Sequence, residues 1–446
     1  MTDATANAAP AAGRRTSKSI IETDANTRKR NAAEARFRYY GMAAIGVGLF
    51  FLCALTFSIL RSGLPAFTET AVTVDFTLSQ EQFDEAEGQV LKTAAYEGFF
   101  VRELQAELNE EGASDVEVSE AAVGRIMGKV GSQIREFYRA NPDRLGEEVS
   151  FTLPASSRVD RYLNGNLSRE QLTNSRFLEP DDLDIVDGLV ESGVMVNAFD
   201  WGFITGTDSG VDNPGGAGLG ASIMGSFFMM LVVLVLALPI GVAASIYLEE
   251  FAPQNKFTDL IEINISNLAA VPSIVFGILG LAVFIQFAHL PQSAPLVGGL
   301  VLTLMTLPTI IISTRASLKS VPPSIRAAAL GVGASKMQSV FHHVLPLAMP
   351  GILTGTIIGL AQALGETAPL LLIGMVGYVA RQHPDGLASG LLDPNSAMPA
   401  QIYTWAARSD PAFYEKAWGG IIILLVFLLF MNAIAIILRR RFERRW

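Results

Sequence analysis

The sequence predicts a mainly α-helical membrane protein that crosses the bilayer several times and carries one α+β domain outside it. Half of the 446 residues are hydrophobic, only 17% are charged, and the mean hydropathy is +0.36. This composition is more apolar than that of ordinary soluble proteins. Six stretches are long enough to span a bilayer, which needs about 20 apolar residues each. A long acidic segment lies between the first two of them.

The predicted spans form one N-terminal anchor and a group of five. They run over residues 41–60, 222–248, 268–288, 296–314, 351–375 and 419–438. The apolar core of the first span is longer than the h-region of a signal peptide, so we expect a retained transmembrane anchor at 41–61. Residues 1–40 are rich in Ala, Thr, Arg and Asn and are predicted to form a disordered basic tail. The other five spans form a membrane core over residues 216–440.

Lysine and arginine side chains gather near three points of the chain. Several precede the first span, others form the tail 441–446, and the loop 319–346 adds Lys319, Arg326 and Lys336. Basic residues near span ends stay in the cytoplasm, and with six spans all three regions fall on one side. We therefore predict a multi-pass protein of the bacterial inner membrane with both termini and this loop in the cytoplasm. Residues 62–215 are then periplasmic, and the 376–417 loop faces outward too.

Residues 62–215 are predicted to fold as an α+β domain. The stretch 71–78, AVTVDFTL, alternates like a strand, and 147–153, EEVSFTL, predicts a second one. A helix over 79–108 begins at Ser79 with Gln82 three residues later, which is the pattern of a capping box. Another helix over 119–141 ends before Pro142. A Gly-rich connector over 202–220 leads into the second span.

The charge of this domain argues against binding nucleic acid or a small anion. Residues 61–215 hold about 12 basic and about 29 acidic side chains, a net charge near −17. Because the whole chain carries −10, the rest is near +7. An acidic surface of this size repels anionic ligands.

No catalytic or metal site is predicted. A P-loop needs the pattern G-x-x-x-x-G-K-[ST]. The nearest stretch, GRIMGKVGS at 124–132, has the wrong spacing and places Val130 in the hydroxyl position. His342 and His343 are adjacent and point to different helix faces, while Cys53 is the only cysteine and lies inside the first span. We expect no cofactor bound by this chain and no enzymatic activity of its own.

The loop between the fourth and fifth spans carries a distinctive pattern, AAALGVGASKMQSVFHHVLPLAMPG at 327–351. Gly333 can adopt positive φ and end a first helix. Ser335 is a suitable N-cap for a short second helix over 336–344 that stops before Pro346. The pattern therefore predicts two short helices on the cytoplasmic side.

This layout resembles the EAA loop of ABC-importer permeases, whose consensus is Glu-Ala-Ala, three variable residues, Gly, and a hydrophobic-x-Leu-Pro ending. The positions that match are Ala328, Ala329, Gly333, Leu345 and Pro346. In that family the loop docks into a cleft of a separate ATPase. The glutamate of the motif is Ala327 here, and His343 replaces a hydrophobic residue. The contact of that glutamate is then lost, or Arg326 replaces it.

Four further stretches look like the phosphate-specific permeases of the PstA type. They are SIYLEEFAP at 245–253, LAAVPSIVFGILGL at 268–281, TLPTIIISTRASLKSVPPSIR at 306–326 and ALGETAPLLLIG at 363–374. The resemblance covers residues 215–440 and implies the type I, MetI-like permease fold. It also implies a phosphate importer with a second permease (PstC type), an ATPase dimer that holds ATP and Mg²⁺ (PstB type) and an external phosphate-binding protein (PstS type).

Two alternatives stay open beside this reading. The cargo can be another oxyanion, such as sulfate or molybdate, or the chain can be a membrane-anchored phosphate sensor. For the periplasmic domain we expect a docking or stabilising role towards the binding protein or the partner permease.

The fifth span supplies candidates for the transport pathway. Gly351, Gly355 and Gly359 recur every four residues and permit close helix packing. Gln362 and Glu366 fall on or near the same stripe. A carboxylate at membrane depth is costly unless it is paired or faces water, so Glu366 acts as a gate or counter-charge, or it locks two permease subunits together.

Four other polar or proline positions complete the candidates. Thr367 can donate a hydrogen bond to a passing oxyanion. Arg315, at the inner end of the fourth span, either snorkels to the interface or helps to release the anion. Pro272 and Pro369 interrupt their spans and are read as hinge or packing positions.

Overall fold

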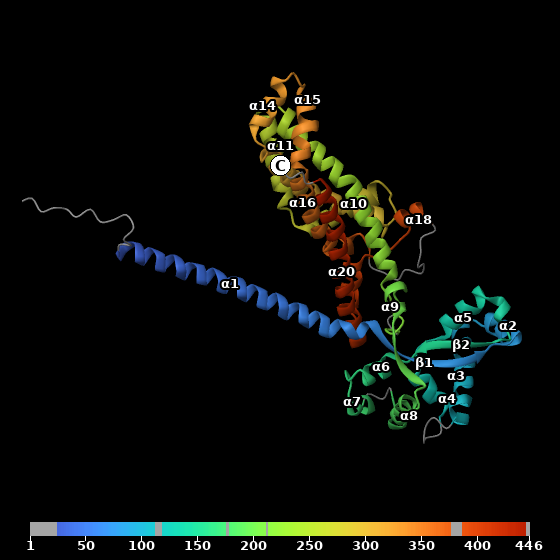
Figure 1. Cartoon of the computed structure of the whole chain (residues 1–446). Helices are drawn as coiled ribbons and strands as arrows, with labels where there is room; N and C mark the ends of the chain where they lie inside the picture. Colours follow the sequence, from blue (N-terminus) through green and yellow to red (C-terminus); the bar gives the residue numbers. More distant parts are fainter. Residues whose placement is uncertain (1–24, 112–117, 175–177, 211–212, 376–385, 443–446) are drawn as a thin grey trace, which may run out of the picture. The chain divides into compact units, whose positions relative to one another are not determined.

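A computed structural model describes residues 25–111, 118–174, 178–210, 213–375 and 386–442 (Figure 1). The chain divides into two compact units, one that ends at Ser58 and one that starts at Ile59. The second unit contains a three-stranded sheet and all of the remaining helices.

Helix α1 (Ala25–Gly63) contains the predicted anchor and begins earlier than the sequence predicted. The prediction of a disordered tail is wrong for residues 25–40, which form the first turns of this helix. Residues 1–24 lie outside the described residues. The segment 25–40 holds four Ala and several Arg, all good helix formers. Extending an existing helix fixes one residue per new hydrogen bond, whereas starting a helix is costly, so the apolar span draws this segment into the helix.

The inserted domain, which we define as Leu64–Phe199, is built on an antiparallel sheet of order β2-β1-β3. A 3₁₀ turn, η1 (Leu64–Phe67), leads into β1 (Thr68–Thr77), which pairs with β2 (Glu148–Pro154) and β3 (Met195–Phe199). The two predicted strands correspond to β1 and β2. The third was missed because β3 is short and only Met195 in it is buried.

Helices cover this sheet and confirm the α+β class. They are α2 (Gln80–Gly88), α3 (Lys92–Glu111), α4 (Glu120–Ile126), α5 (Gly131–Ala140), η2 (Pro142–Arg144), α6 (Ser157–Leu163), α7 (Arg169–Asn174) and α8 (Pro180–Glu191). The capping box of Ser79 and Gln82 is confirmed. Each of the two long predicted helices is wrong as a single element. The chain becomes extended after Gly88, and again at Met127, which forms a β-bridge with Ala155.

The inserted domain has its own hydrophobic core. Phe76, Phe100, Tyr138 and Phe151 are buried, and the Phe76 ring lies 5.8–6.4 Å from the other three ring centroids. Aromatic pairs at such separations stabilise beyond the area that they bury. The inserted domain therefore has a hydrophobic cluster separate from that of the membrane helices.

The rest of the second unit is helical. Its elements are α9 (Trp201–Thr205), α10 (Gly220–Ile246), η3 (Tyr247–Phe251), α11 (Lys256–Ala269), α12 (Ser273–Gly280), η4 (Leu281–Phe287), α13 (Pro295–Lys319), α14 (Pro323–Gly331), α15 (Lys336–Ser339), η5 (Val340–Val344), α16 (Leu345–Leu364), α17 (Ala368–Leu372), α18 (Leu387–Leu392), α19 (Met398–Ala406) and α20 (Pro411–Phe442). By length and composition five helices of the described chain can cross a membrane, and a sixth results if one bent pair counts as a span.

The bent pair replaces the third predicted span. Residues 256–269 and 273–287 form two helices at 99° to each other, so the straight span predicted over 268–288 is wrong. Pro272 follows the break; proline lacks the N–H that would continue the first helix and disfavours helical backbone at the residue before it.

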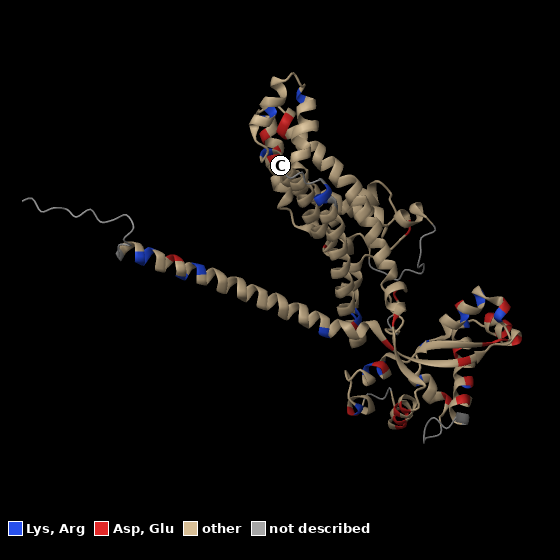
Figure 2. Cartoon of the chain, viewed as in Figure 1, with Lys and Arg blue, Asp and Glu red and all other residues tan. Residues whose placement is uncertain are grey.

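Helix α13 lies at the centre of the membrane core. It packs against α10, α11, α12 and α16. Gly241 on α10 and Gly299 on α13 allow this close approach, because a Cβ at either position would press into Ile310 or Val232. Figure 2 shows that charged residues are frequent in the inserted domain and around α14 and rare along α10, α16 and the middle of α20.

Candidate functional site

The turn between α14 and α15 has two well-formed helix ends. Gly333 has φ +89°, which confirms the predicted positive φ. The Gly333 N–H donates to the Leu330 carbonyl (3.0 Å) and the Ala334 N–H to the Ala329 carbonyl (3.1 Å), which is a Schellman motif. Ser335 caps α15, as predicted, and Gln338 completes a capping box.

The outer face of this turn is apolar and exposed. Leu330, Val332, Met337 and Phe341 are all exposed, Val332 to 86%. Ala328 is exposed as well, whereas Ala329 is buried against the helices behind it. We call these four large side chains the coupling patch. Several apolar side chains together on a membrane protein's polar end indicate a surface that a protein partner covers.

The prediction that the second helix stops before Pro346 is wrong. Residues 336–364 form one continuous helix through α15, η5 and α16. Its middle turn is a π-turn in which the Leu345 N–H donates to the Val340 carbonyl. A π-turn shifts the hydrogen-bond register, and Pro346 follows it directly, at the start of α16. The same helix therefore carries Met337 and Phe341 of the coupling patch and continues into the membrane core.

Arg326 is held inside the protein. Its guanidinium forms a bidentate ion pair with Glu250 (Nη2–Oε1 2.6 Å) and donates to the carbonyls of Val321 and Leu318. Glu250 is only 7% exposed. To replace the missing motif glutamate at a partner surface, the Arg326 guanidinium would have to leave Glu250, so this role stays a prediction.

Arg315 is the centre of a second ion-pair group. It contacts Glu262 on α11 (2.6 Å) and Glu249 in η3 (3.3 Å), and Lys319 lies 3.6 Å from Glu249. The Arg315 guanidinium is therefore already paired, and its two predicted roles, snorkelling and anion release, both stay predictions. Together with the Arg326 pair, these contacts tie the end of α10 to α11, α13 and α14.

The fifth predicted span is broken where its polar residues lie. Helix α16 ends at Leu364 and α17 begins at Ala368, so the predicted continuous helix to residue 375 is wrong. Gln362 is exposed at the last turn of α16, and Glu366 and Thr367 are half-buried in the break. Within the described residues the Glu366 carboxylate has no hydrogen-bond or ion-pair partner. Such irregular backbone at membrane depth needs protein or water around it.

The glycine stripe of α16 faces α13. A Cβ at Gly351 would overlap Ser317, and one at Gly355 would overlap Ser313, whereas one at Gly359 would meet Ile310 at an ordinary 3.5 Å. The first two glycines therefore set the distance between α13 and α16.

Sequence reasoning missed the acidic partners Glu249, Glu250 and Glu262. A signal was available, since a Glu-Glu pair ends one apolar helix and Arg315 ends another. Opposite charges at neighbouring helix ends tend to pair when both are partly buried. In the described part of the chain, no group of three or more His, Cys, Asp or Glu side chains could hold a metal ion.

Two protein families match separate parts of the chain. Residues 237–446 match the family described as "Binding-protein-dependent transport system inner membrane component". Residues 24–172 match a "Domain of unknown function (DUF3333)". The membrane core and the inserted domain thus have different relatives.

Curated proteins resemble the membrane core. The probable ABC transporter permease protein YqgI of Bacillus subtilis is 33% identical over 41% of this chain and 60% of its own length. The phosphate transport system permease protein PstA of Mycobacterium leprae is 31% identical, over 47% of this chain and 67% of its own. PstA 1 of Mycobacterium tuberculosis (strain H37Rv) is 30% identical, over 50% of this chain and 70% of its own.

Proposed function

Because the chain belongs to the family of PstA permeases of phosphate transport systems, we propose that it forms one transmembrane half of an ATP-driven importer of inorganic phosphate. The names of the relatives indicate phosphate as the transported ion, and the coupling patch supports coupling to a separate ATPase. ATP and Mg²⁺ then act on a partner, and this chain binds neither.

Coupling follows from the patch and the helix behind it. The partner ATPase seats on Leu330, Val332, Met337 and Phe341, in a loop whose Ala328, Ala329, Gly333, Leu345 and Pro346 match the coupling motif. The helix over 336–364 spans roughly 40 Å. A displacement of Met337 and Phe341 therefore reaches the break at 365–367 along one helix.

The break is the proposed position of the gate. Gln362, Glu366 and Thr367 supply an amide, a carboxylate and a hydroxyl there. An unpaired carboxylate repels a phosphate anion, so Glu366 acts as a gate or counter-charge and does not bind the cargo. Thr367 and Gln362 can donate hydrogen bonds to the passing oxyanion.

The proposed assembly needs three partners. They are a second permease of the PstC type, a pair of ATPase subunits of the PstB type, and an external phosphate-binding protein of the PstS type. The inserted domain and the coupling patch lie at opposite ends of α10, since α9 adjoins its start and Glu250 follows its end. This supports a periplasmic inserted domain, cytoplasmic termini and a cytoplasmic patch.

Uptake of labelled phosphate tests the function. Cells that lack this chain are compared with cells in which it is restored, with sulfate, molybdate and arsenate as competitors. We expect restored uptake that only phosphate or arsenate competes away. Competition by sulfate or molybdate would change the cargo, and restored signalling with unchanged uptake would contradict transport.

A further inference from the structure

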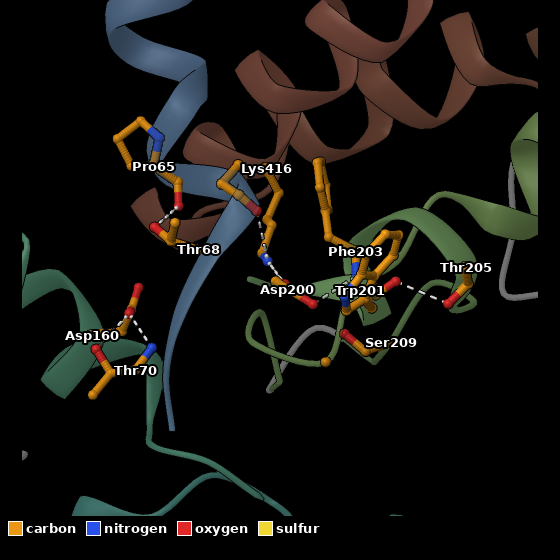
Figure 3. A network of polar contacts seen from close by, with 12 residues as sticks. Pro65, Thr68, Thr70, Asp160, Asp200, Trp201, Phe203, Thr205, Ser209 and Lys416 are labelled. Carbon is orange, nitrogen blue, oxygen red and sulfur yellow. Dashed lines mark hydrogen bonds and ion pairs between the residues drawn. The ribbon is translucent and has the colours of Figure 1, made fainter. Parts of the chain in front are cut away.

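A buried ion pair at the C-terminal edge of the inserted domain joins Asp200, the residue that follows Phe199, to α20. Lys416 on α20 lies 2.6 Å from the Asp200 carboxylate, and the two side chains are 11% and 3% exposed (Figure 3). The Lys416 ammonium also donates to the Ala66 carbonyl (3.4 Å) and lies over the Phe203 ring at 4.7 Å. Asp200 in turn caps α9 by accepting from the Phe203 N–H (2.7 Å).

A second set of contacts lies beside it. Arg161 on α6 pairs with Glu415 on α20 at 2.9 Å. Its neighbour Asp160 accepts two hydrogen bonds of 2.8 Å from the Thr70 N–H and hydroxyl on β1 (Figure 3). Strand β1, helix α6 and helix α20 are therefore fastened together by charge.

Glu69 stands among these groups without a partner of its own. Within the described residues its carboxylate makes no hydrogen bond or ion pair. It lines a cavity of about 30 Å³ together with Asp160, Arg161, Glu415 and Lys416. This space is on the scale of a single water and excludes a larger ligand.

Solvent reaches Glu69 from its other side. A wide polar cavity of about 730 Å³ also has Glu69 in its wall, with Lys129 and Glu136 from the α4–α5 region and with Asp200 and Asp208. Protons can therefore exchange with Glu69 while the junction stays closed.

The charges at the junction do not balance. Four carboxylates, those of Glu69, Asp160, Asp200 and Glu415, surround two cations, Arg161 and Lys416. Burial first, and then the charge of Asp200, raises the pKa of Glu69 to about 7, although Lys416 opposes this rise. Burial also raises the pKa of Asp160, against the two hydrogen bonds from Thr70.

We propose that this junction is a proton-operated latch in which protonated Glu69 leaves Lys416 paired with Asp200 and ionised Glu69 releases the inserted domain from α20. When Glu69 ionises, it competes for Lys416 and repels Asp200 and Asp160. The single positive charge of Lys416 on α20 is then shared between Asp200, which caps α9, and the ionised carboxylate of Glu69.

The direction of the pH response follows from the two states of Glu69. With the junction open, Glu69 is solvated and has its ordinary pKa of 4.5; with the junction closed, the pKa is about 7. The closed state thus binds the extra proton, and its stability falls as the pH rises from 4.5 to 7. Above that range the latch is at its weakest.

The latch is a property of this chain whatever anion the complex carries. If the inserted domain faces the periplasm, as proposed above, Glu69 responds to the pH outside the cell. The domain is then held firmly in acid surroundings and moves more freely in alkaline ones.

Distance measurement on the full chain in lipid nanodiscs tests the proposal. Spin labels are placed at Val190→Cys on α8 and Tyr403→Cys on α19, two exposed helical positions, in a Cys53→Ser background. We expect a single narrow distance distribution at pH 4.5 and a second, broader population at pH 8.5, with a midpoint between pH 4.5 and about 7.

Two substitutions separate the latch from a general effect of pH. Glu69→Gln should keep the narrow distribution at both pH values, since the side chain cannot ionise. Glu136→Gln removes an exposed carboxylate of the same wide cavity and should leave the midpoint unchanged. An unchanged wild-type distribution between pH 4.5 and 8.5, or a Glu69→Gln protein that still broadens, would overturn the latch while leaving phosphate uptake untouched.

Discussion

Gly355 on α16 lies directly against the hydroxyl of Ser313 on α13, with no room for a Cβ between them. These two helices connect the coupling patch, the ion pairs of Arg315 and the break at Glu366. The glycine therefore determines how closely the moving helix follows its neighbour.

Replacing Gly355 with valine should force α13 and α16 apart. Overpacking of this kind costs about 1–3 kcal/mol, so we expect a lower melting temperature in detergent and at least a tenfold loss of uptake. Gly359→Ala is the matched control, because its Cβ would meet Ile310 at 3.5 Å. Equal effects of the two substitutions would contradict the packing argument.

Gly333→Asp should uncouple transport from ATP hydrolysis. Aspartate at φ +89° is strained by roughly 1 kcal/mol, and its charge adjoins the coupling patch. Uptake and substrate-stimulated ATPase activity should fall together, while the amount of protein in the membrane stays constant. Gly331→Ala is the control, since Gly331 is exposed, has no left-handed φ and has nothing within 4 Å of a Cβ. Full activity of Gly333→Asp would remove the coupling role.

The Arg326–Glu250 pair should behave as a structural unit. Removing one partner of a buried pair strands the other and costs about 3–5 kcal/mol, an upper bound here because Arg326 is 24% exposed. We expect Arg326→Met and Glu250→Gln each to lower thermal stability, with the double variant less impaired than the sum. Additive losses in this double-mutant cycle would mean that the two side chains act separately.

Glu366→Gln distinguishes a gate from a subunit lock. If the carboxylate gates the pathway, uptake changes at least tenfold while the second permease still copurifies. If it locks the subunits, copurification itself is lost. Asp393→Asn, an exposed carboxylate substitution outside the break, should alter neither quantity.

Acid should weaken the inserted domain through Glu87. Hydrogen bonds from Arg135 and then Lys92 lower the pKa of Glu87 to about 2. A lowered pKa contributes stability that is present above the ordinary value of 4.5 and is lost as the pH falls towards 2. Calorimetry of the full chain should show this loss for the inserted domain, and Glu87→Gln should reduce its dependence on pH in that range.

The sequence predicted local features well where one residue decides the outcome. Alternation revealed β1 and β2, and Gly333 and Ser335 revealed the two ends of the coupling turn, because positive φ and capping are properties of single positions. Strand β3 was not predicted, because its pairing with β1, and not an alternating pattern of its own, makes it a strand.

The predictions failed where distant residues decide. Pro346 looked like a helix end, but a π-turn over 340–344 lets the helix continue. The partners of Arg315 and Arg326 were missed, because Glu249, Glu250 and Glu262 pair with them across 53–76 positions of sequence. Such pairings depend on how helices pack, which a pattern along one segment does not contain.

Helix α1 is long for a helix that only crosses a bilayer. Its 39 residues measure roughly 58 Å, about twice the 30 Å of hydrocarbon that a membrane presents. The surplus lies in the segment 25–40, where Arg28, Lys29, Arg30, Arg36 and Arg38 make a basic rod. An upright α1 would therefore carry residue 25 roughly 20 Å beyond the hydrocarbon.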